Sequence, residues 1–325
     1  MLTQSSLNLY RACPRRFRWR YVDGWRDTTL YPELEVGTLV HLGLELFWTG
    51  HSWSDTKRKL INDRVAFFHS GEGLVRFAQI LAYVEGYFKT YDLNDWETLG
   101  VEEVFDVEIQ GIPFSGKLDA RARRKSDGRQ FLIEHKTSAN PNENYWRKLA
   151  NGMDAQLVLY SEAVRIMTGE DCSILYDVIT KHKSGPTYRL VDGKIPKPRK
   201  RKVESDEDFS QRKADLMETL EEYQQRLAQV YGSTGENYLR QIITCTAQEH
   251  KDALDDLIFV ARQVEASKKE NRFPRSSSNC YSYGRMCEYF NICTGADTPE
   301  TSGHLNKEID LHPELKKEEK TDEPF

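Results

Sequence analysis

The sequence of 325 residues predicts an α/β fold in which three consecutive strands are followed by a helix, a fourth strand and further helices. The first observation is the turn signal Ser126-Asp127-Gly128, which separates two stretches of strand character. The second is the amphipathic pattern of residues 154–168, which ends at Gly169 and is typical of a helix. The third is the apolar run of residues 173–180, which is typical of a buried strand.

The other expected elements of the first half follow from caps, helix breakers and apolar spacing. Two helical pieces are expected within residues 3–20, because Pro14 breaks or restarts the helix. Residues 34–48 have one apolar side, and residues 54–70 and 72–92 predict two more amphipathic helices. The strands of the core are expected near residues 101–109, 112–122, 130–137 and 173–180.

The second half is expected to be helical and rich in loops. Residues 181–208 are basic and contain prolines, which predicts a loop or a mobile hairpin. Residues 209–231 predict a charged helix, and the capping box Thr246-Ala247-Gln248-Glu249 opens a helix that ends near Lys269. Residues 270–295 are rich in loops and hold three cysteines.

The composition is that of a globular chain with room for one large domain or two small ones. Hydrophobic residues make up 38% of it, including 16 Tyr, 14 Phe and 6 Trp. No apolar run reaches the length of a membrane span, and the first residues lack the basic and apolar regions of a signal peptide. We therefore expect a cytoplasmic protein with no membrane partner.

The net charge of −5 hides a segregation of charge along the chain. Residues 296–325 contain nine acidic and four basic residues, so the rest of the chain is neutral overall. Within that neutral part, residues 11–26 hold six arginines against a single acid, and residues 194–202 form a second basic cluster with no acid. Such clusters suit a phosphate backbone, and the aromatic residues between the arginines can stack on bases. Arg15 and Arg16 are candidate DNA contacts; the alternative is a solvated surface.

Two carboxylates and a lysine are expected to converge on one face of the predicted sheet. Glu134 and Lys136 lie two residues apart on one strand and point to the same side, and Asp119 can approach them from the paired strand. Two carboxylates suit Mg²⁺ or Mn²⁺, which polarises a phosphoryl oxygen and lowers the pKa of bound water. The ammonium can orient that water. This set suits phosphodiester hydrolysis; the alternative is an edge hairpin with a cross-strand salt bridge.

The same stretch resembles the PD-(D/E)XK nuclease superfamily. Asp119, in Gly116-Lys117-Leu118-Asp119, fits the first acidic position, and Glu134-His135-Lys136 fits the (D/E)XK signature. Leu118 stands where the family name has proline. The resemblance implies a restriction-endonuclease-like αβββαβ core, here with helical additions at both ends of the chain. It also implies that Asp119, Glu134 and Lys136 are catalytic, with Lys136 positioning or activating the attacking water.

Two further motifs resemble the RecB-like branch of this superfamily. Gly37-Thr38-Leu39-Val40-His41 resembles GxxxH, and Gln156-x-x-x-Tyr160 resembles QxxxY, which supports the active-site lysine and the DNA. Taken singly, His41 has the alternative of a core histidine, and Gln156 that of a polar helix position. The resemblance implies that Mg²⁺ or Mn²⁺ is held by His41, Asp119, Glu134 and the carbonyl of His135. Either Glu102 or Glu103, one strand earlier, is expected to add an acidic contact.

The cysteines suggest a second metal site. Cys280, Cys287 and Cys293 lie in a loop-rich stretch, where sulfurs can converge, and a fourth ligand is needed for a tetrahedral site or a cluster. Cys13 is the candidate fourth ligand. This pattern resembles the iron–sulfur nucleases, which include AddB-type domains, CRISPR-associated RecB-like exonucleases and phage relatives. The resemblance implies that an iron–sulfur cluster, of the 4Fe-4S type, joins the two ends of the nuclease. The first gap is six residues where the family has two, so Zn²⁺ remains an alternative.

These observations divide the chain into a nuclease domain at residues 1–295 and an acidic, disordered tail at residues 296–325. Within the domain, the core is expected at about 34–181, the basic loop at 182–208 and a helical, cysteine-rich part at 209–295. No phosphate-binding loop of the Gly-x-x-x-x-Gly-Lys-Ser/Thr type is present, so no helicase motor is expected in this chain.

The resulting hypothesis is a metal-dependent DNA exonuclease acting on single-stranded DNA, in repair, recombination or phage DNA metabolism. Because the chain has no motor, a helicase or recombination protein is a conceivable partner. One alternative is a structure-specific endonuclease on the same core. Another is a non-catalytic DNA-binding recombination protein that retains a relict site.

Overall fold

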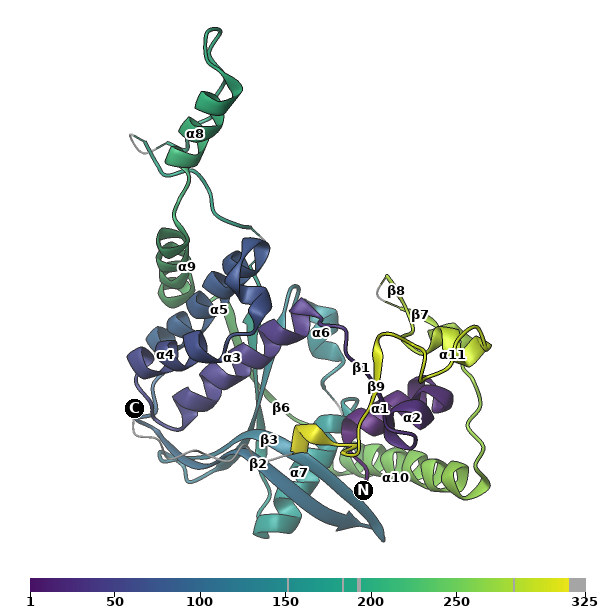
Figure 1. Cartoon of the computed structure of the whole chain (residues 1–325). Coiled ribbons are helices and arrows are strands. Elements are labelled where there is room, and N and C mark those ends of the chain that lie inside the picture. Colours follow the sequence, from purple (N-terminus) through teal and green to yellow (C-terminus); the bar gives the residue numbers. More distant parts are fainter. Residues whose placement is uncertain (151, 183, 192–193, 283, 316–325) are drawn as a thin grey trace.

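The computed structural model describes residues 1–315, except residues 151, 183, 192–193 and 283, and shows a central sheet with helices on both faces (Figure 1). The central sheet consists of β2 (Trp96–Ile109), β3 (Ile112–Arg124), β4 (Gln130–Ser138), β5 (Ser173–Thr180) and β6 (Tyr238–Ile243), in that order. Neighbouring strands are antiparallel except β4 and β5, which are parallel. The mixed α/β architecture predicted from the sequence is confirmed.

Side chains that alternate along β4 build a separate core on each face of the sheet. Phe131 and Ile133 face one layer of helices, whereas Leu132, between them, faces the other. The first layer contains α3 (Pro32–Trp48), α4 (Trp53–Asp63), α5 (Gly71–Thr90) and α9 (Leu220–Thr234). The second layer contains α1 (Gln4–Ala12), α2 (Pro14–Tyr21), α7 (Ala155–Thr168) and α10 (Ala247–Glu270).

The helix boundaries follow the local signals in the sequence. Asp154 caps α7 through its side chain, and Gly169 ends it with a φ of +75°, a conformation that glycine adopts without strain. Thr246 and Glu249 form the expected capping box of α10. Pro14 is the first residue of α2, where its missing N–H costs no hydrogen bond, so the predicted interruption separates α1 from α2.

Three expectations about secondary structure differ from the structure. Residues 209–231 were expected to form one helix, but α8 (Asp206–Leu216) ends before Thr219, whose capping box starts α9. Strand β6 was not expected, because the short run at 238–243 has weak alternation. The helix expected at 54–70 ends at Asp63, and a 3₁₀ turn, η1 (Ala66–His69), follows it.

The described part of the C-terminal tail also differs from the disorder expected from residue 296. Strand β9 (Leu305–Lys307) pairs antiparallel with β1 (Trp25–Asp27), and Leu305 is buried. Glu308 forms an ion pair with Arg26 at 2.5 Å. The pairing of β9 with β1 and the ion pair with Arg26 hold this segment against the N-terminal part of the chain. Residues 316–325 lie outside the described residues.

The remaining elements are short. They are α6 (Glu143–Arg147), η2 (Ser277–Asn279), β7 (Tyr281–Ser282), β8 (Arg285–Met286), α11 (Phe290–Thr294) and η3 (Pro313–Leu315). No helix in the described part of the chain is long and apolar enough to cross a membrane.

Candidate active site

The candidate site lies where β3 and β4 separate. The two strands pair from Arg123↔Gln130 to Ala120↔Ile133, and the pairing stops there. Beyond this point the backbone N–H of His135 donates a hydrogen bond to the side chain of Asp119, at 2.8 Å to Oδ2, in place of a backbone carbonyl. Because the N–H and C=O of one strand residue point to the same side, the His135 carbonyl is also directed at this gap.

Glu134 is almost completely buried, with a side chain 1% exposed. Its Oε1 accepts a hydrogen bond from Gln156 Nε2 at 2.7 Å and forms an ion pair with Lys136. Its Oε2 is buried and has no hydrogen-bond partner among the described residues. A buried carboxylate oxygen without a partner is costly, so this atom is well suited to accept a bound cation or a water.

His41 and Glu102 reach Asp119 from two other elements. On α3, His41 Nδ1 lies 3.4 Å from Asp119 Oδ1. On β2, Glu102 lies opposite Asp119, between the pairs Val101↔Ala120 and Glu103↔Leu118. One ligand atom from each of His41, Glu102 and Asp119 lies within 4.8 Å of the others. Like charges directly across a strand pair repel each other, and a cation bound between them removes that repulsion.

Of the two glutamates that could add an acidic contact, Glu102 has the better position. Glu102 has a φ of +48°, an unusual backbone conformation for a non-glycine residue, and its carboxylate also pairs with Lys117. Glu103 points elsewhere and forms a bidentate contact with Arg121, with distances of 2.6 and 3.1 Å. Arg121 therefore neutralises Glu103, whereas Glu102 remains next to His41 and Asp119.

Opposite charges lie close together in this buried site, and they shift the pKa values of its side chains. Burial opposes ionisation of Asp119, but the neighbouring His41 and Lys136 hold the pKa of this carboxyl well below its usual value. Burial raises the pKa of Glu134 to about 7, against the opposing effect of Lys136. Burial alone would lower the pKa of Lys136, yet Glu134 and Asp119 outweigh it and raise that pKa, so the ammonium stays charged.

The two α7 residues of the QxxxY motif lie at the site, in different roles. Gln156 contacts Glu134 directly, as described above. Tyr160 lies one turn further along α7, is 9% exposed and packs edge-on against Phe105 with ring centroids 5.4 Å apart. Burial and the nearby carboxylates of Glu134 and Asp119 raise the pKa of Tyr160, which keeps the phenol neutral. Gly116 leaves room for both rings, since an added Cβ would lie 2.5 Å from Phe105 and 3.0 Å from Tyr160.

The side chain of His135 points to the face of the sheet that α3 covers, with its ring 6.4 Å from that of His41, and belongs to a buried polar network that sequence reasoning missed. Trp48 Nε1 donates to His135 Nε2 at 3.0 Å, and Nδ1 lies 3.5 Å from Asp177 Oδ2. Arg240 and Tyr87 also contact this oxygen, at 2.7 and 2.6 Å. Burial opposes ionisation of Asp177, but Arg240 holds its pKa well below the usual value. The network fixes the backbone of β4 beside the site. The one signal for it was an aspartate within the apolar run 173–180.

The segments that carry the four candidate cluster cysteines meet at one end of the second helical layer. Cys13 Sγ accepts a hydrogen bond from the backbone of Ser276 at 3.4 Å, and the Cys287 N–H donates to the Cys280 carbonyl at 2.7 Å. Cys293 lies on α11, and its carbonyl accepts from Arg275 at 3.4 Å. All four thiols are free and half-buried.

Arg15 and Arg16 tie the two ends of the chain together. Arg15 Nε donates to the Phe273 carbonyl at 2.8 Å, and Arg16 forms an ion pair with Glu288 at 2.8 Å. Both guanidinium groups are therefore engaged within the chain. These contacts give both residues a structural role, and their contact with DNA stays a prediction.

Comparison with known proteins agrees with this fold. The family model of the PD-(D/E)XK nuclease superfamily matches residues 1–294, so the chain belongs to this superfamily. Its structure is similar to the crystal structure of a protein from Eubacterium rectale described as a candidate exonuclease, with a TM-score of 0.50 and 13% sequence identity. The match covers 95% of this chain and 91% of the other. No curated protein matches the sequence. At this level of identity the structural likeness bears on the fold alone.

Proposed function

We propose that this protein is a Mg²⁺- or Mn²⁺-dependent exonuclease of the RecB-like branch that hydrolyses single-stranded DNA. One observation carries the proposal: His41, Glu102 and Asp119 converge beside the Glu134–Lys136 pair at the point where β3 and β4 separate. Membership of the nuclease superfamily supports DNA as the substrate class. The exonuclease activity and the preference for single strands are the proposed part.

The donor set fits a hard divalent cation, because carboxylate oxygens, a histidine nitrogen and a backbone carbonyl are available together. We assign His41, Asp119, Glu134 and the His135 carbonyl as ligands, with Glu102 as an additional acidic contact. The unpartnered Oε2 of Glu134 supports this assignment. When bound, the cation acts as a Lewis acid on the scissile phosphate and acidifies a water molecule.

The other residues of the site hold the proposed metal ligands in place and orient the attacking water. The carboxylates of Glu134 and Asp119 raise the pKa of Lys136, which favours the ammonium and a role in positioning the water and balancing phosphate charge. Gln156 fixes Oε1 of Glu134, and Tyr160 supports this end of α7. The Trp48–His135–Asp177 network holds the β4 backbone, and with it the carbonyl of His135.

An iron–sulfur cluster held by Cys13, Cys280, Cys287 and Cys293 is the second proposed cofactor. A single tetrahedral Zn²⁺ ion on the same four cysteines is the alternative. The iron and zinc contents of the protein decide between that ion and the proposed cluster. Its contribution would be to join the N-terminal helices to the C-terminal segment.

The test is a cleavage assay on end-labelled linear single-stranded DNA, with Mn²⁺ or Mg²⁺ against EDTA, using anaerobically purified protein. The expected result is metal-dependent shortening from one end, with no cleavage of a circular single strand. Cleavage of the circle would identify an endonuclease and reject the exonuclease part. An absence of cleavage by protein of full metal content would reject catalysis altogether.

A pair of neighbouring glutamates provides a matched test of the metal site. We expect Glu102→Gln to raise the Mn²⁺ concentration needed for half-maximal cleavage by about tenfold, because the loss of one acidic contact costs about 1.4 kcal/mol or more of cation binding. Glu103→Gln, the control, changes the same functional group one residue away and should leave that concentration unchanged. Metal titrations of both variants would decide, and a larger effect of Glu103→Gln would overturn the placement.

Cation affinity should rise with pH through neutrality. The ligand form of Glu134 is the carboxylate, and burial raises its pKa to about 7, so protons compete with the cation below that pH. We expect the Mn²⁺ dissociation constant to rise by up to tenfold for each pH unit below 7 and to stay constant above pH 7. Calorimetric titration between about pH 5.5 and 8 measures this dependence. Glu134→Gln should bind weakly at every pH, and a wild-type affinity that is flat across the range would contradict the assignment.

A further inference from the structure

Residues 187–217 form an arm, and its described residues contribute almost nothing to either hydrophobic core. After β5, the chain runs outward, turns back through α8 and returns to α9, and α8 with its preceding loop stands away from the rest of the molecule (Figure 1). No residue of α8 is buried. On the arm, Val203 is 98% and Ile195 57% exposed. An ordered segment costs conformational entropy, and here burial of apolar surface does not offset that cost.

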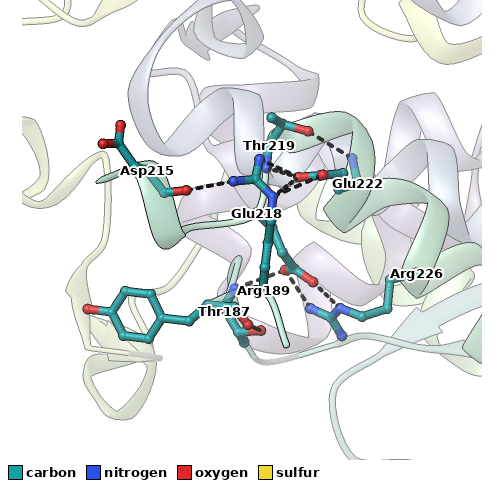
Figure 2. Close-up of polar contacts among 8 residues, drawn as sticks. Thr187, Arg189, Asp215, Glu218, Thr219, Glu222 and Arg226 are labelled. Carbon is teal, nitrogen blue, oxygen red and sulfur yellow. Dashed lines mark hydrogen bonds and ion pairs between the residues drawn. The ribbon is translucent and has the colours of Figure 1, made fainter. Parts of the chain in front are cut away.

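The base of the arm is nonetheless held by a defined set of contacts. Its outgoing and returning segments are joined by a single antiparallel bridge, Tyr188↔Met217. Arg189 donates to both carboxylate oxygens of Glu222, at 3.0 and 2.9 Å, and to the Asp215 carbonyl at 2.7 Å. Figure 2 shows this guanidinium between the two acceptors, above a second pair formed by Glu218 with Arg226. The base is therefore fixed to α9, which belongs to the first helical layer.

The loop before α8 carries a concentrated positive charge, and the acids Glu204, Asp206, Glu207 and Asp208 follow it. Residues 194–202 include six cations and no acid: Lys194, Lys197, Arg199, Lys200, Arg201 and Lys202. All six are exposed. Between described residues, Lys200 has an ion pair, with Asp206 at 2.7 Å, and no ion pair is recorded for the other five. Pro196 and Pro198 favour an extended backbone, which spreads the cations along a line. Like charges held together repel each other, and a polyanion relieves that repulsion.

The arm starts beside the candidate site. The Lys181 N–H, one residue after β5, donates to the carbonyl of Ser138 at 2.7 Å, and Ser138 ends the strand that carries Glu134 and Lys136. From residue 181 to the base at residue 187 the chain spans at most about 20 Å, and α8 adds about 16 Å. A DNA strand with about 3.4 Å per nucleotide covers this distance with roughly ten nucleotides.

We propose that residues 194–202 bind the phosphate backbone of the DNA strand outside the catalytic site, so that substrates long enough to reach the arm bind more tightly than short ones. The proposal rests on the nuclease function proposed above and adds a length dependence to it. The ligand is nucleic-acid backbone, because the exposed groups are cations on an extended segment, and cations bind phosphate whatever the base sequence.

The test compares wild-type protein with the triple variant Lys197→Gln, Arg199→Gln and Lys202→Gln. Its matched control is Lys57→Gln, Arg58→Gln and Lys59→Gln, which removes the same residue types from α4. Binding is measured in EDTA by fluorescence anisotropy, on labelled single strands of roughly 30 and roughly 5 nucleotides, at several salt concentrations.

On the long strand, we expect the arm variant to bind about tenfold more weakly and the slope of log affinity against log salt to fall by about 2. On the short strand, the loss should be much smaller, and the α4 control should match the wild type on both. An arm variant that binds the long strand as the wild type does would overturn the proposal and point to an acidic protein partner. Equal losses on both strands would also overturn it, because the cluster would then lie at the catalytic site.

Failure of the arm proposal and failure of the nuclease proposal can be told apart. If the wild type cleaves DNA and the arm variant binds the long strand as tightly as the wild type, only the arm proposal is rejected. Length-dependent binding through the arm without any cleavage supports the arm and rejects the exonuclease. The side chains substituted in the arm variant are exposed, so an unchanged circular dichroism spectrum and melting temperature are expected and confirm that folding is intact.

Discussion

Asp119→Asn is expected to lower the cleavage rate by about a factor of 10³ while leaving DNA binding almost unchanged. Asp119 lies at the centre of the site: it contacts His41 at 3.4 Å, faces Glu102 across the strand pair and accepts a hydrogen bond from the backbone of His135. Its pKa is held well below the usual value, so it is a carboxylate at every pH of interest. The amide is nearly isosteric but has lost the charge that holds a cation.

Single-turnover rates on labelled DNA measure the first effect, and anisotropy in EDTA measures the second. Binding should be retained or slightly tighter, because removal of a negative charge near phosphate reduces repulsion. Asp106→Asn is the control, since Asp106 lies on the adjacent strand β2, is exposed and bonds to Ser115 away from the site. Equal losses of binding and cleavage in Asp119→Asn would contradict the division of roles, and substantial remaining activity would remove Asp119 from catalysis.

The sequence predicted the strands of the candidate site well because their signals are local. The turn at residues 126–128 and the helix signals at Asp154 and Gly169 depend on a few neighbouring residues, and each appears in the structure at the predicted place. The proximity of Asp119 to Glu134 and Lys136 follows once the two strands pair. The site could therefore be assembled from periodicity and motif spacing.

The parts that were missed depend on contacts between distant segments. Asp177 and Arg240 bond to each other across 63 positions, and Arg240 lies on β6, a strand with no clear pattern of its own. The order in residues 296–315 arises because β9 pairs with β1, which lies at the other end of the chain. Composition alone marked this segment as acidic and polar, and its partner could not be identified without the fold. The choice of Glu102 over Glu103 likewise needed the register of β2 against β3.

The largest expected effect on stability is that of Cys287→Ala. Cys287 is half-buried, and its backbone N–H donates to the carbonyl of Cys280. Burial raises the pKa of its thiol to about 11, so without a metal the group is a neutral thiol held in a partly apolar place. Metal or cluster binding replaces that proton and contributes directly to folding. Loss of one ligand should lower the melting temperature by at least about 10 °C and reduce the yield of soluble protein.

The control for this variant is Cys245→Ala, which removes a half-buried thiol that lies outside the proposed cluster. It should shift the melting temperature by no more than about 3 °C, as an ordinary packing change does. Iron and zinc contents and the visible absorbance of the wild type, recorded on the same anaerobic samples, identify the bound group. A soluble, fully active Cys287→Ala protein with wild-type stability would eliminate the cluster as the link between the two ends. If the two cysteine variants lose stability equally, packing of the thiols explains the effect, and the contacts of Arg15 and Arg16 with the C-terminal segment are then what holds those ends together.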